Sequence, residues 1–197
     1  MTSRMLVAGV GNIFLGDDGF GVEVARRLAT EDLPGWVRVA DYGISGLHLA
    51  YDLADGYETT ILVDATSRGD DPGTVYVIEL DHSQPPGVAA DSPGAGQLFD
   101  AHGMQPDVLF GVLGMLGAQA GRVLLVGCEP ASVDYGIGLS PPVTAAVGDA
   151  VRVVKDLIAA AGRDQHPASG DQHRADGDQH PSATVPEEPG KAADTCV

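Results

Sequence analysis

Short apolar segments alternate with amphipathic ones along the first four fifths of the chain. Five of the apolar segments are rich in Val, Leu and Ile, and they predict β-strands at residues 4–11, 36–41, 59–65, 73–80 and 121–129. Segment 59–65 is apolar without alternation, which is typical of a strand covered on both faces. Segment 73–80 alternates and is therefore expected towards an edge of the sheet.

Helical periodicity separates these strands. Four helices are predicted, at residues 19–30, 46–53 and 106–118 and after Pro141-Pro142. The last one carries an apolar stripe made of Val143, Val147, Ala150, Val151, Val154 and Ile158. Segment 106–118 is apolar nearly all round and contains three glycines, Gly111, Gly114 and Gly117, which weaken a helix. We expect it to be a buried helix whose glycines allow close backbone approach.

Alternating strands and helices predict the α/β class, as a single three-layer (αβα) domain with a mostly parallel sheet of about five strands. A length of 197 residues suits one domain of this kind. The pattern assigns residues 1–162 to this domain. Residues 163–197 form a separate low-complexity segment.

The C-terminal segment is acidic and repeats the triplet DQH at 164–166, 171–173 and 178–180. It holds almost no large apolar residues, so burial cannot offset the entropy of ordering it, and we expect a disordered tail. Because His and Asp bind divalent ions, a weak metal-buffering role is the alternative.

Composition excludes several classes of protein. The formal net charge is −17, from 11 basic and 28 acidic residues, which argues against binding to nucleic acid or to anionic membranes. The two cysteines, Cys128 and Cys196, make neither a disulfide framework nor a zinc motif. No secretory pattern or membrane-length apolar run is present, and no long exposed apolar stripe stands out. We expect a cytoplasmic monomer.

The glycine-rich segment GVGNIFLGDDGFG (9–21) holds the first candidate chemistry. It begins like a dinucleotide fingerprint, but Phe14 stands where the third glycine belongs. Asp17 and Asp18 would also repel a phosphate at the start of the helix. These two aspartates either cap that helix or, in at least one case, contact a cation.

Two further candidates are Asp64, which closes the strand 59–65, and His102, which precedes the helix at Pro106. A carboxylate at the exit of a buried strand needs a metal ion or backbone amides to offset its desolvation. A loop histidine is either a ligand or simply solvated. His48 and His82 have weaker settings, and we assign them structural or surface roles.

Functional groups in open α/β sheets collect at the carboxyl ends of the strands. Asp18, Asp64 and His102 would there form a ligand set that suits Ni, Fe, Mn or Zn. The Pro- and Gly-rich loop 82–101 either borders a substrate groove or is a surface connector. No organic cofactor is indicated.

Several segments, in order, resemble the motifs of the hydrogenase maturation proteases: VAGVGNIFLGDDGFGVEVARRL, DYGISGLHLAYDL, TTILVDA, AHGMQPDVLF and VGCEPASVDYGIGLSPPV. The resemblance covers residues 4–160. In that family a Glu or Asp in the first motif, an Asp after the third strand and a later His bind the metal. These positions are Asp18, Asp64 and His102 here. Because Asp is shorter than the Glu of some members, Asp17 is a possible substitute.

The resemblance implies an endopeptidase that removes the C-terminal extension of a nickel–iron hydrogenase large-subunit precursor. The precursor would bring the nickel, which Asp18, Asp64 and His102 would help to coordinate. Either the metal activates the peptide bond or water, or Asp18 or Asp64 acts as a general base. The alternatives are a non-enzymatic nickel-handling protein and another peptidase on a similar α/β scaffold.

Overall fold

The computed structural model describes residues 4–80 and 106–165. The chain divides into two units, Met1–Pro167 and Ala168–Val197, and every described element lies in the first. The strands are β1 (Met5–Val10), β2 (Val37–Gly43), β3 (Thr59–Ala65), β4 (Val75–Leu80) and β5 (Arg122–Cys128). The helices are the 3₁₀-helix η1 (Gly16–Gly19), α1 (Phe20–Leu28), α2 (Gly46–Ala54), α3 (Pro106–Met115) and α4 (Pro141–Gln165).

The five strands form one sheet in the order β2-β1-β3-β5-β4. Strands β2, β1, β3 and β5 run parallel, whereas β4 pairs antiparallel with β5 at the edge. The predicted α/β class, the mostly parallel sheet and the edge position of segment 73–80 are confirmed. The four parallel strands therefore present their carboxyl ends at the same side of the domain.

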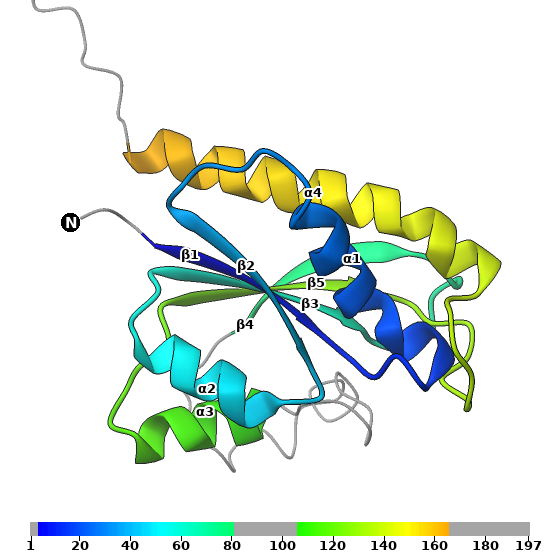
Figure 1. Ribbon diagram of the computed structural model, residues 1–197, viewed down its shortest axis with the longest axis horizontal. Coiled ribbons are helices and arrows are strands. Elements are labelled where there is room, and N and C mark those ends of the chain that lie inside the picture. The colour runs from blue at the N-terminus through cyan, green and yellow to red at the C-terminus, as the bar shows by residue number, and fades with distance from the viewer. Residues whose placement is uncertain (1–3, 81–105, 166–197) are drawn as a thin grey trace, which may run out of the picture. The chain divides into compact units, whose positions relative to one another are not determined.

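Helices cover both faces of the sheet, which gives the predicted three layers (Figure 1). One core lies between the sheet and helices α1 and α4, with Phe20 and Val154 fully buried. A second core lies on the opposite face under α2 and α3, with Leu49 and Leu125 fully buried. Strand β3 contributes to both cores, which explains its uninterrupted apolar sequence.

Helix α1 lies very close to the sheet, and two glycines make this approach possible. A Cβ on Gly9 would lie 2.3 Å from the carbonyl oxygen of Gly21. A Cβ on Gly21 would lie 2.0 Å from the carbonyl oxygen of Val63. Because these neighbours are backbone atoms, a side chain at either position would force the helix away from β1 and β3.

Helix α3 differs from the prediction. Leu109 and Leu113 are buried, but Met115 is 82% exposed. A Cβ on Gly111 or Gly114 would meet nothing within 4 Å. The prediction of an all-round buried helix with close approach at its glycines is therefore wrong: α3 packs one face on the second core and leaves the other in solvent.

Helix α4 follows the predicted stripe. All six of its apolar positions are buried, with Val151 the most exposed at 8%. The helix continues to Gln165, three residues beyond the predicted domain end. Most of the predicted tail lies outside the described residues. Within the described ranges, no helix is long and apolar enough to cross a membrane.

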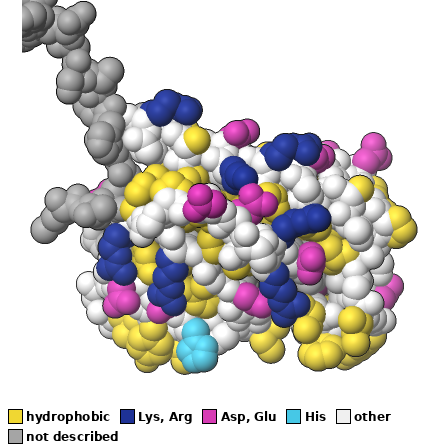
Figure 2. Space-filling model, turned by 45° about the horizontal axis from the view of Figure 1, so that its top comes forward, with side chains coloured by type: hydrophobic (Ala, Val, Ile, Leu, Met, Phe, Trp, Pro, Cys, Tyr) yellow, Lys and Arg dark blue, Asp and Glu magenta, His cyan; other side chains and the backbone are white. Residues whose placement is uncertain are grey.

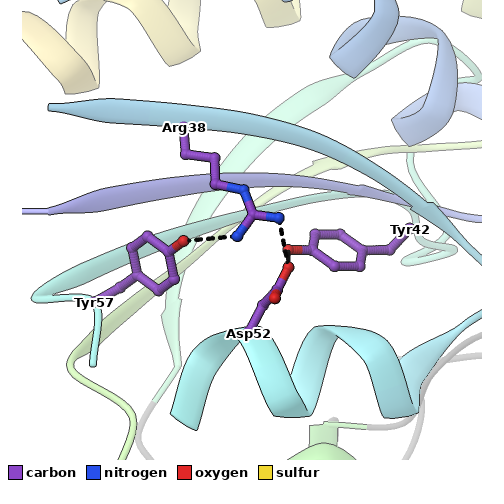
Figure 3. A network of polar contacts seen from close by, with 4 residues as sticks. All are labelled: Arg38, Tyr42, Asp52 and Tyr57. Carbon is purple, nitrogen blue, oxygen red and sulfur yellow. Dashed lines mark hydrogen bonds and ion pairs between the residues drawn. The ribbon is translucent and has the colours of Figure 1, made fainter. Parts of the chain in front are cut away.

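A polar network joins α2 to β2 (Figure 3). Arg38 of β2 donates to the Tyr57 hydroxyl at 3.0 Å and pairs with Asp52 of α2 at 2.8 Å. The Tyr42 hydroxyl donates to the same Asp52 carboxylate at 2.5 Å. Burial and this hydrogen bond raise the pKa of Tyr42. The network fixes α2 against the end of β2, where the chain reaches the carboxyl edge of the sheet.

Charged side chains of both signs are interspersed on the face that Figure 2 shows. Surface ion pairs include Arg26 with Asp41 at 3.3 Å and Lys155 with Glu31 at 2.5 Å. Exposed pairs of this kind contribute little to stability, about 0–1 kcal/mol each. The excess of acidic residues is thus not gathered into one patch on this face.

Candidate functional site

The carboxyl ends of β1 and β3 bring Asp18 and Asp64 to the same region. Asp64 is the penultimate residue of β3, and Asp18 lies in η1, which follows β1. The two strands are neighbours in the sheet, so their ends meet at one edge. Asp18 is 6% exposed and Asp64 3% exposed. Two buried carboxyl groups therefore come from segments 46 residues apart in the chain.

Asp64 lacks a hydrogen bond that its burial would normally require. Its Oδ1 atom receives no donor from the part of the chain that the structure describes. Burial raises the pKa of Asp64 well above its usual range, the nearby Asp18 carboxylate raises it further, and the Ala65 amide opposes the shift. A divalent cation, or a donor on a bound peptide, would satisfy this oxygen. The position therefore fits a ligand-binding carboxylate.

Gly11 lies between Asp18 and Asp64, where there is no room for a side chain. Its backbone has a φ of +127°. A Cβ there would lie 1.8 Å from the main-chain oxygen of Asp18 and 3.7 Å from Asp64 Oδ1. The glycine lets the η1 backbone approach the end of β3, and this contact is what brings the aspartates together.

Asp18 is oriented by the loop that precedes it. The backbone amide of Asn12 donates to its Oδ2 atom at 2.7 Å. Neither η1 nor α1 has a side-chain hydrogen bond at its N-cap, and the N-cap of α1 is Gly19. The interpretation of Asp17 and Asp18 as helix caps is therefore wrong, and both carboxylates serve other contacts.

Asp17 anchors the loop that joins β5 to α4. Asp17 is 1% exposed, so the residue is buried. Its carboxylate accepts hydrogen bonds from the amides of Ala131 at 2.8 Å, Ser132 at 3.2 Å and Ser140 at 2.6 Å, and from the Ser140 hydroxyl at 2.8 Å. Since both Asp17 oxygens are engaged, this residue is poorly placed to replace Asp18.

The different roles of these adjacent residues follow from the geometry of η1. A 3₁₀-helix has about three residues per turn, so consecutive side chains point about 120° apart. Asp17 is directed to loop 131–140, and Asp18 to Asn12 at the end of β1. A pair of identical residues thus supplies one structural anchor and one candidate functional group.

Glu129 holds the connection after β3 against the end of β5. The residue is 4% exposed and accepts hydrogen bonds from the Ser67 hydroxyl at 2.9 Å and from the amides of Arg68 at 2.6 Å and Gly69 at 3.2 Å. Burial raises its pKa, but these donors outweigh burial and hold the pKa below its usual value. These contacts give the Glu129 carboxylate a structural role.

Tyr76 and Thr66 lie beside the same strand ends. The Tyr76 hydroxyl donates to the Thr66 carbonyl at 2.7 Å, and burial is the main cause that raises the pKa of Tyr76 to about 12. The Thr66 hydroxyl is buried and has no partner among the described residues. It follows Asp64 by two positions. Nothing in the sequence points to this hydroxyl, because threonine after a strand carries no distinctive signal.

Of His48, His82 and His102, only His48 lies in the described part of the chain. His102 and His82 lie outside the described residues, and His48 is exposed on α2. Within residues 4–80 and 106–165, no three His, Cys, Asp or Glu side chains converge into a group that could hold a metal ion. The described part of the site is therefore the pair Asp18 and Asp64.

Two buried carboxyl groups can hold a cation together or divide acid and base roles between them.

The role of Asp17 could not be seen in the sequence, since its partner Ser140 is 123 residues away. The signal that could have revealed it is the repetition itself: one aspartate suffices for one ligand position, so the second required its own explanation.

The chain is similar to known proteins in sequence and in fold. A model of the family described as hydrogenase maturation protease matches residues 22–157. The hydrogenase expression/formation protein HupD of Rhodobacter capsulatus is 35% identical over 158 residues, which cover 77% of this chain and 71% of that protein. The hydrogenase 2 maturation protease of Escherichia coli is 31% identical over 165 residues, covering 83% and 96%. The solved structure of the hydrogenase maturating endopeptidase HybD from E. coli superposes with a TM-score of 0.67 at 29% identity, over 81% of this chain and 94% of that one.

Proposed function

Because the chain belongs to the hydrogenase maturation proteases, we propose that it removes the C-terminal extension of a nickel–iron hydrogenase large-subunit precursor after nickel insertion. The family implies a peptidase whose client is a hydrogenase large-subunit precursor. The observation that supports our proposal most directly is the buried pair Asp18 and Asp64, with Asp64 Oδ1 unpartnered in the described part of the chain.

Nickel would enter this site as part of the client. The precursor would hold the ion, and the protease would complete its coordination through Asp18, Asp64 and His102. An ion shared between two proteins adds affinity only when it is present, so cleavage would depend on nickel loading. The unpartnered Asp64 oxygen fits this scheme, because a cation delivered by the client would remove the cost of its burial.

Bond cleavage itself requires an activated water. In the mechanism we propose, the ion positions the client and a carboxylate, Asp18 or Asp64, takes a proton from the attacking water. The two groups differ in their surroundings, since Asp18 accepts an amide hydrogen bond whereas Asp64 Oδ1 accepts none in the described ranges. The tight contact at Gly11 keeps both groups in place before the client arrives.

The test compares two preparations of one precursor, nickel-loaded and nickel-free, incubated with the purified chain. Mass spectrometry of the large subunit reports whether the extension has been removed. We expect cleavage of the loaded form alone. Equal cleavage of both forms would exclude recognition through nickel and leave a metal-independent peptidase.

The contribution of His102 needs a separate variant. His102→Ala should reduce cleavage of the loaded precursor by at least tenfold, because one ligand is lost. His48→Ala is the matched control, since His48 is exposed on α2 and should have no effect. Normal processing by His102→Ala would remove this residue from the proposed site.

A further inference from the structure

Three large apolar side chains are exposed near the candidate site. Phe14 is 59% exposed, Tyr135 95% and Ile137 83%. We call these three residues the apolar rim. Large apolar side chains that are exposed together often mark an interaction site.

A short backbone bridge holds the two segments that carry these side chains next to each other. Leu15 and Gly136 form an isolated parallel bridge, in which the Gly136 amide donates to the Phe14 carbonyl at 3.0 Å and the Gly16 amide donates to the Gly136 carbonyl at 3.0 Å. Leu15 is buried, at 8% exposed, whereas its neighbour Phe14 is 59% exposed.

The second segment of the bridge carries the other two members of the rim. Tyr135 and Ile137 flank Gly136, the bridge partner of Leu15. Both are highly exposed, as Phe14 is. The rim is thus one outward-facing group built from two segments more than 100 residues apart.

The backbone beneath the rim is held at several points. The Asp17 carboxylate binds the start and the end of loop 131–140 through Ala131 and Ser140. The Asp17 amide also donates to the Ser132 carbonyl at 3.1 Å. The exposed side chains are therefore presented by a fixed loop, which reduces the entropy lost when a partner binds them.

The rim adjoins the candidate catalytic carboxylates. Phe14 precedes Asp18 by four residues, a span of at most about 14 Å even in an extended chain. A polypeptide whose peptide bond lies at Asp18 and Asp64 can therefore reach the rim within a few residues.

We infer that the apolar rim of Phe14, Tyr135 and Ile137 is a docking surface for apolar side chains of the client precursor beside the bond that is cut. This inference rests on the proposed function. A second copy of the chain fits the surface less well, because the two aromatic side chains bury at most about 300–500 Å² and Ile137 adds less than a ring would, which stays below the roughly 800 Å² per partner of a stable interface. A client segment needs less, since it is also held at the carboxylates.

The test uses the triple variant Phe14→Ser, Tyr135→Ser and Ile137→Ser of the full chain. Its affinity for the nickel-loaded precursor, measured by biolayer interferometry, should fall at least tenfold. KM for cleavage should rise by a similar factor while kcat stays within twofold, because the rim binds the client and does not touch the reacting atoms. Met115→Ser is the control: Met115 is as exposed as the rim, but it lies at the end of α3 that leads into the start of β5, and its variant should match the wild type.

The outcomes separate this inference from the proposed function. Wild-type affinity and KM in the triple variant, with normal cleavage by the wild type, would overturn the docking surface and leave the protease intact. Failure of the wild type to cleave any loaded precursor would overturn the proposed function instead. A wild-type dimer that becomes a monomer in the triple variant, seen by sedimentation velocity, would assign the rim to self-association and overturn the inference. An unchanged thermal midpoint verifies that the variant folds.

Discussion

At the scale of single residues, the carboxyl edge of the sheet contains side chains of the same type in opposite circumstances. Asp17 accepts four hydrogen bonds from one loop, whereas Asp64 has an oxygen to which no described residue donates a hydrogen bond. The first arrangement stabilises the fold and the second costs stability, because a buried polar atom without a partner loses its hydration. Substitution at the two positions should therefore affect stability and activity in opposite ways.

Replacing Asp64 with Asn keeps the shape of the side chain and removes its charge. We expect cleavage of the loaded precursor to fall by about 10²-fold or more, the range for a lost acid–base group or ligand. The thermal midpoint should stay the same or rise, since a buried carboxylate that lacks a partner is destabilising. The measurement is single-turnover cleavage beside differential scanning calorimetry.

Asp149→Asn is the control for that substitution, because Asp149 is exposed on α4 and remote from the strand ends. It should leave both rate and thermal midpoint unchanged. An Asp64→Asn protein that cleaves at the normal rate would show that the chemistry does not use this carboxylate.

Replacing Asp17 with Ala removes the anchor of loop 131–140. We expect a loss of about 2–3 kcal/mol in the free energy of unfolding, since several charge-assisted hydrogen bonds disappear at once. Amide hydrogen exchange at Ala131, Ser132 and Ser140 should become faster. Urea titration gives the free energy, and mass spectrometry of exchanged peptides gives the protection.

Asp134→Ala provides the comparison, since Asp134 is an exposed member of the same loop whose carboxylate accepts a hydrogen bond from the Ser132 hydroxyl. It should cost less than about 0.5 kcal/mol, as surface substitutions usually do. An equal loss for the two variants would mean that Asp17 is no special anchor.

At the scale of helices and strands, the apolar periodicity predicts most of the fold because burial determines it. The uninterrupted apolar run of β3 and the stripe of α4 both correspond to faces that are buried in the structure. The order of strands could not be derived from these patterns, since any parallel neighbour would bury the same side chains. The glycines of α3 show a second limit of the sequence. A glycine marks a position without a Cβ, and only the packing shows whether a neighbouring atom fills that space.

Two alanine substitutions separate these cases. Gly21→Ala in α1 should destabilise the protein by about 3 kcal/mol or more, because its Cβ would meet the carbonyl oxygens of Val63 and Val10. Gly111→Ala in α3 meets nothing within 4 Å and should stabilise the protein by about 0.5–1 kcal/mol through helix propensity. Chemical denaturation of both variants tests the pair. The opposite order of stabilities would contradict the close packing of α1.

At the scale of the whole molecule, the pairing of distant segments limits what the sequence could predict about the site. Asp18 and Asp64 follow from a rule about strand ends, whereas the contacts of Asp17 and Glu129 depend on which loops fold over that edge. His102 stays a prediction, because it lies outside the described residues. Because of these loop contacts, the free energy of unfolding should depend on pH.

Glu129 gives that dependence a definite sign. Its pKa is lower in the folded protein than in the unfolded chain, so its carboxylate stabilises the fold above the ordinary Glu pKa of 4.5 and loses this effect as the pH falls through the lower folded value. Glu129→Gln should therefore be less stable by about 1–2 kcal/mol at pH 7. The difference from the wild type should shrink below about pH 4.

Urea titrations at both pH values measure this difference. Glu23→Gln on the exposed side of α1 is the control and should match the wild type at each pH. A Glu129→Gln deficit that is constant between neutral and acidic solution would show that lost packing, rather than charge, is responsible.

The bridge between Leu15 and Gly136 is made by main-chain atoms alone. Its geometry therefore does not depend on the identity of Phe14, Tyr135 or Ile137, which belong to neither core. Substitutions at these three positions can accumulate without cost to folding. A protease built in this way can adapt to a new client by exchanging a few outward side chains, while Asp18 and Asp64 stay where the sheet has put them.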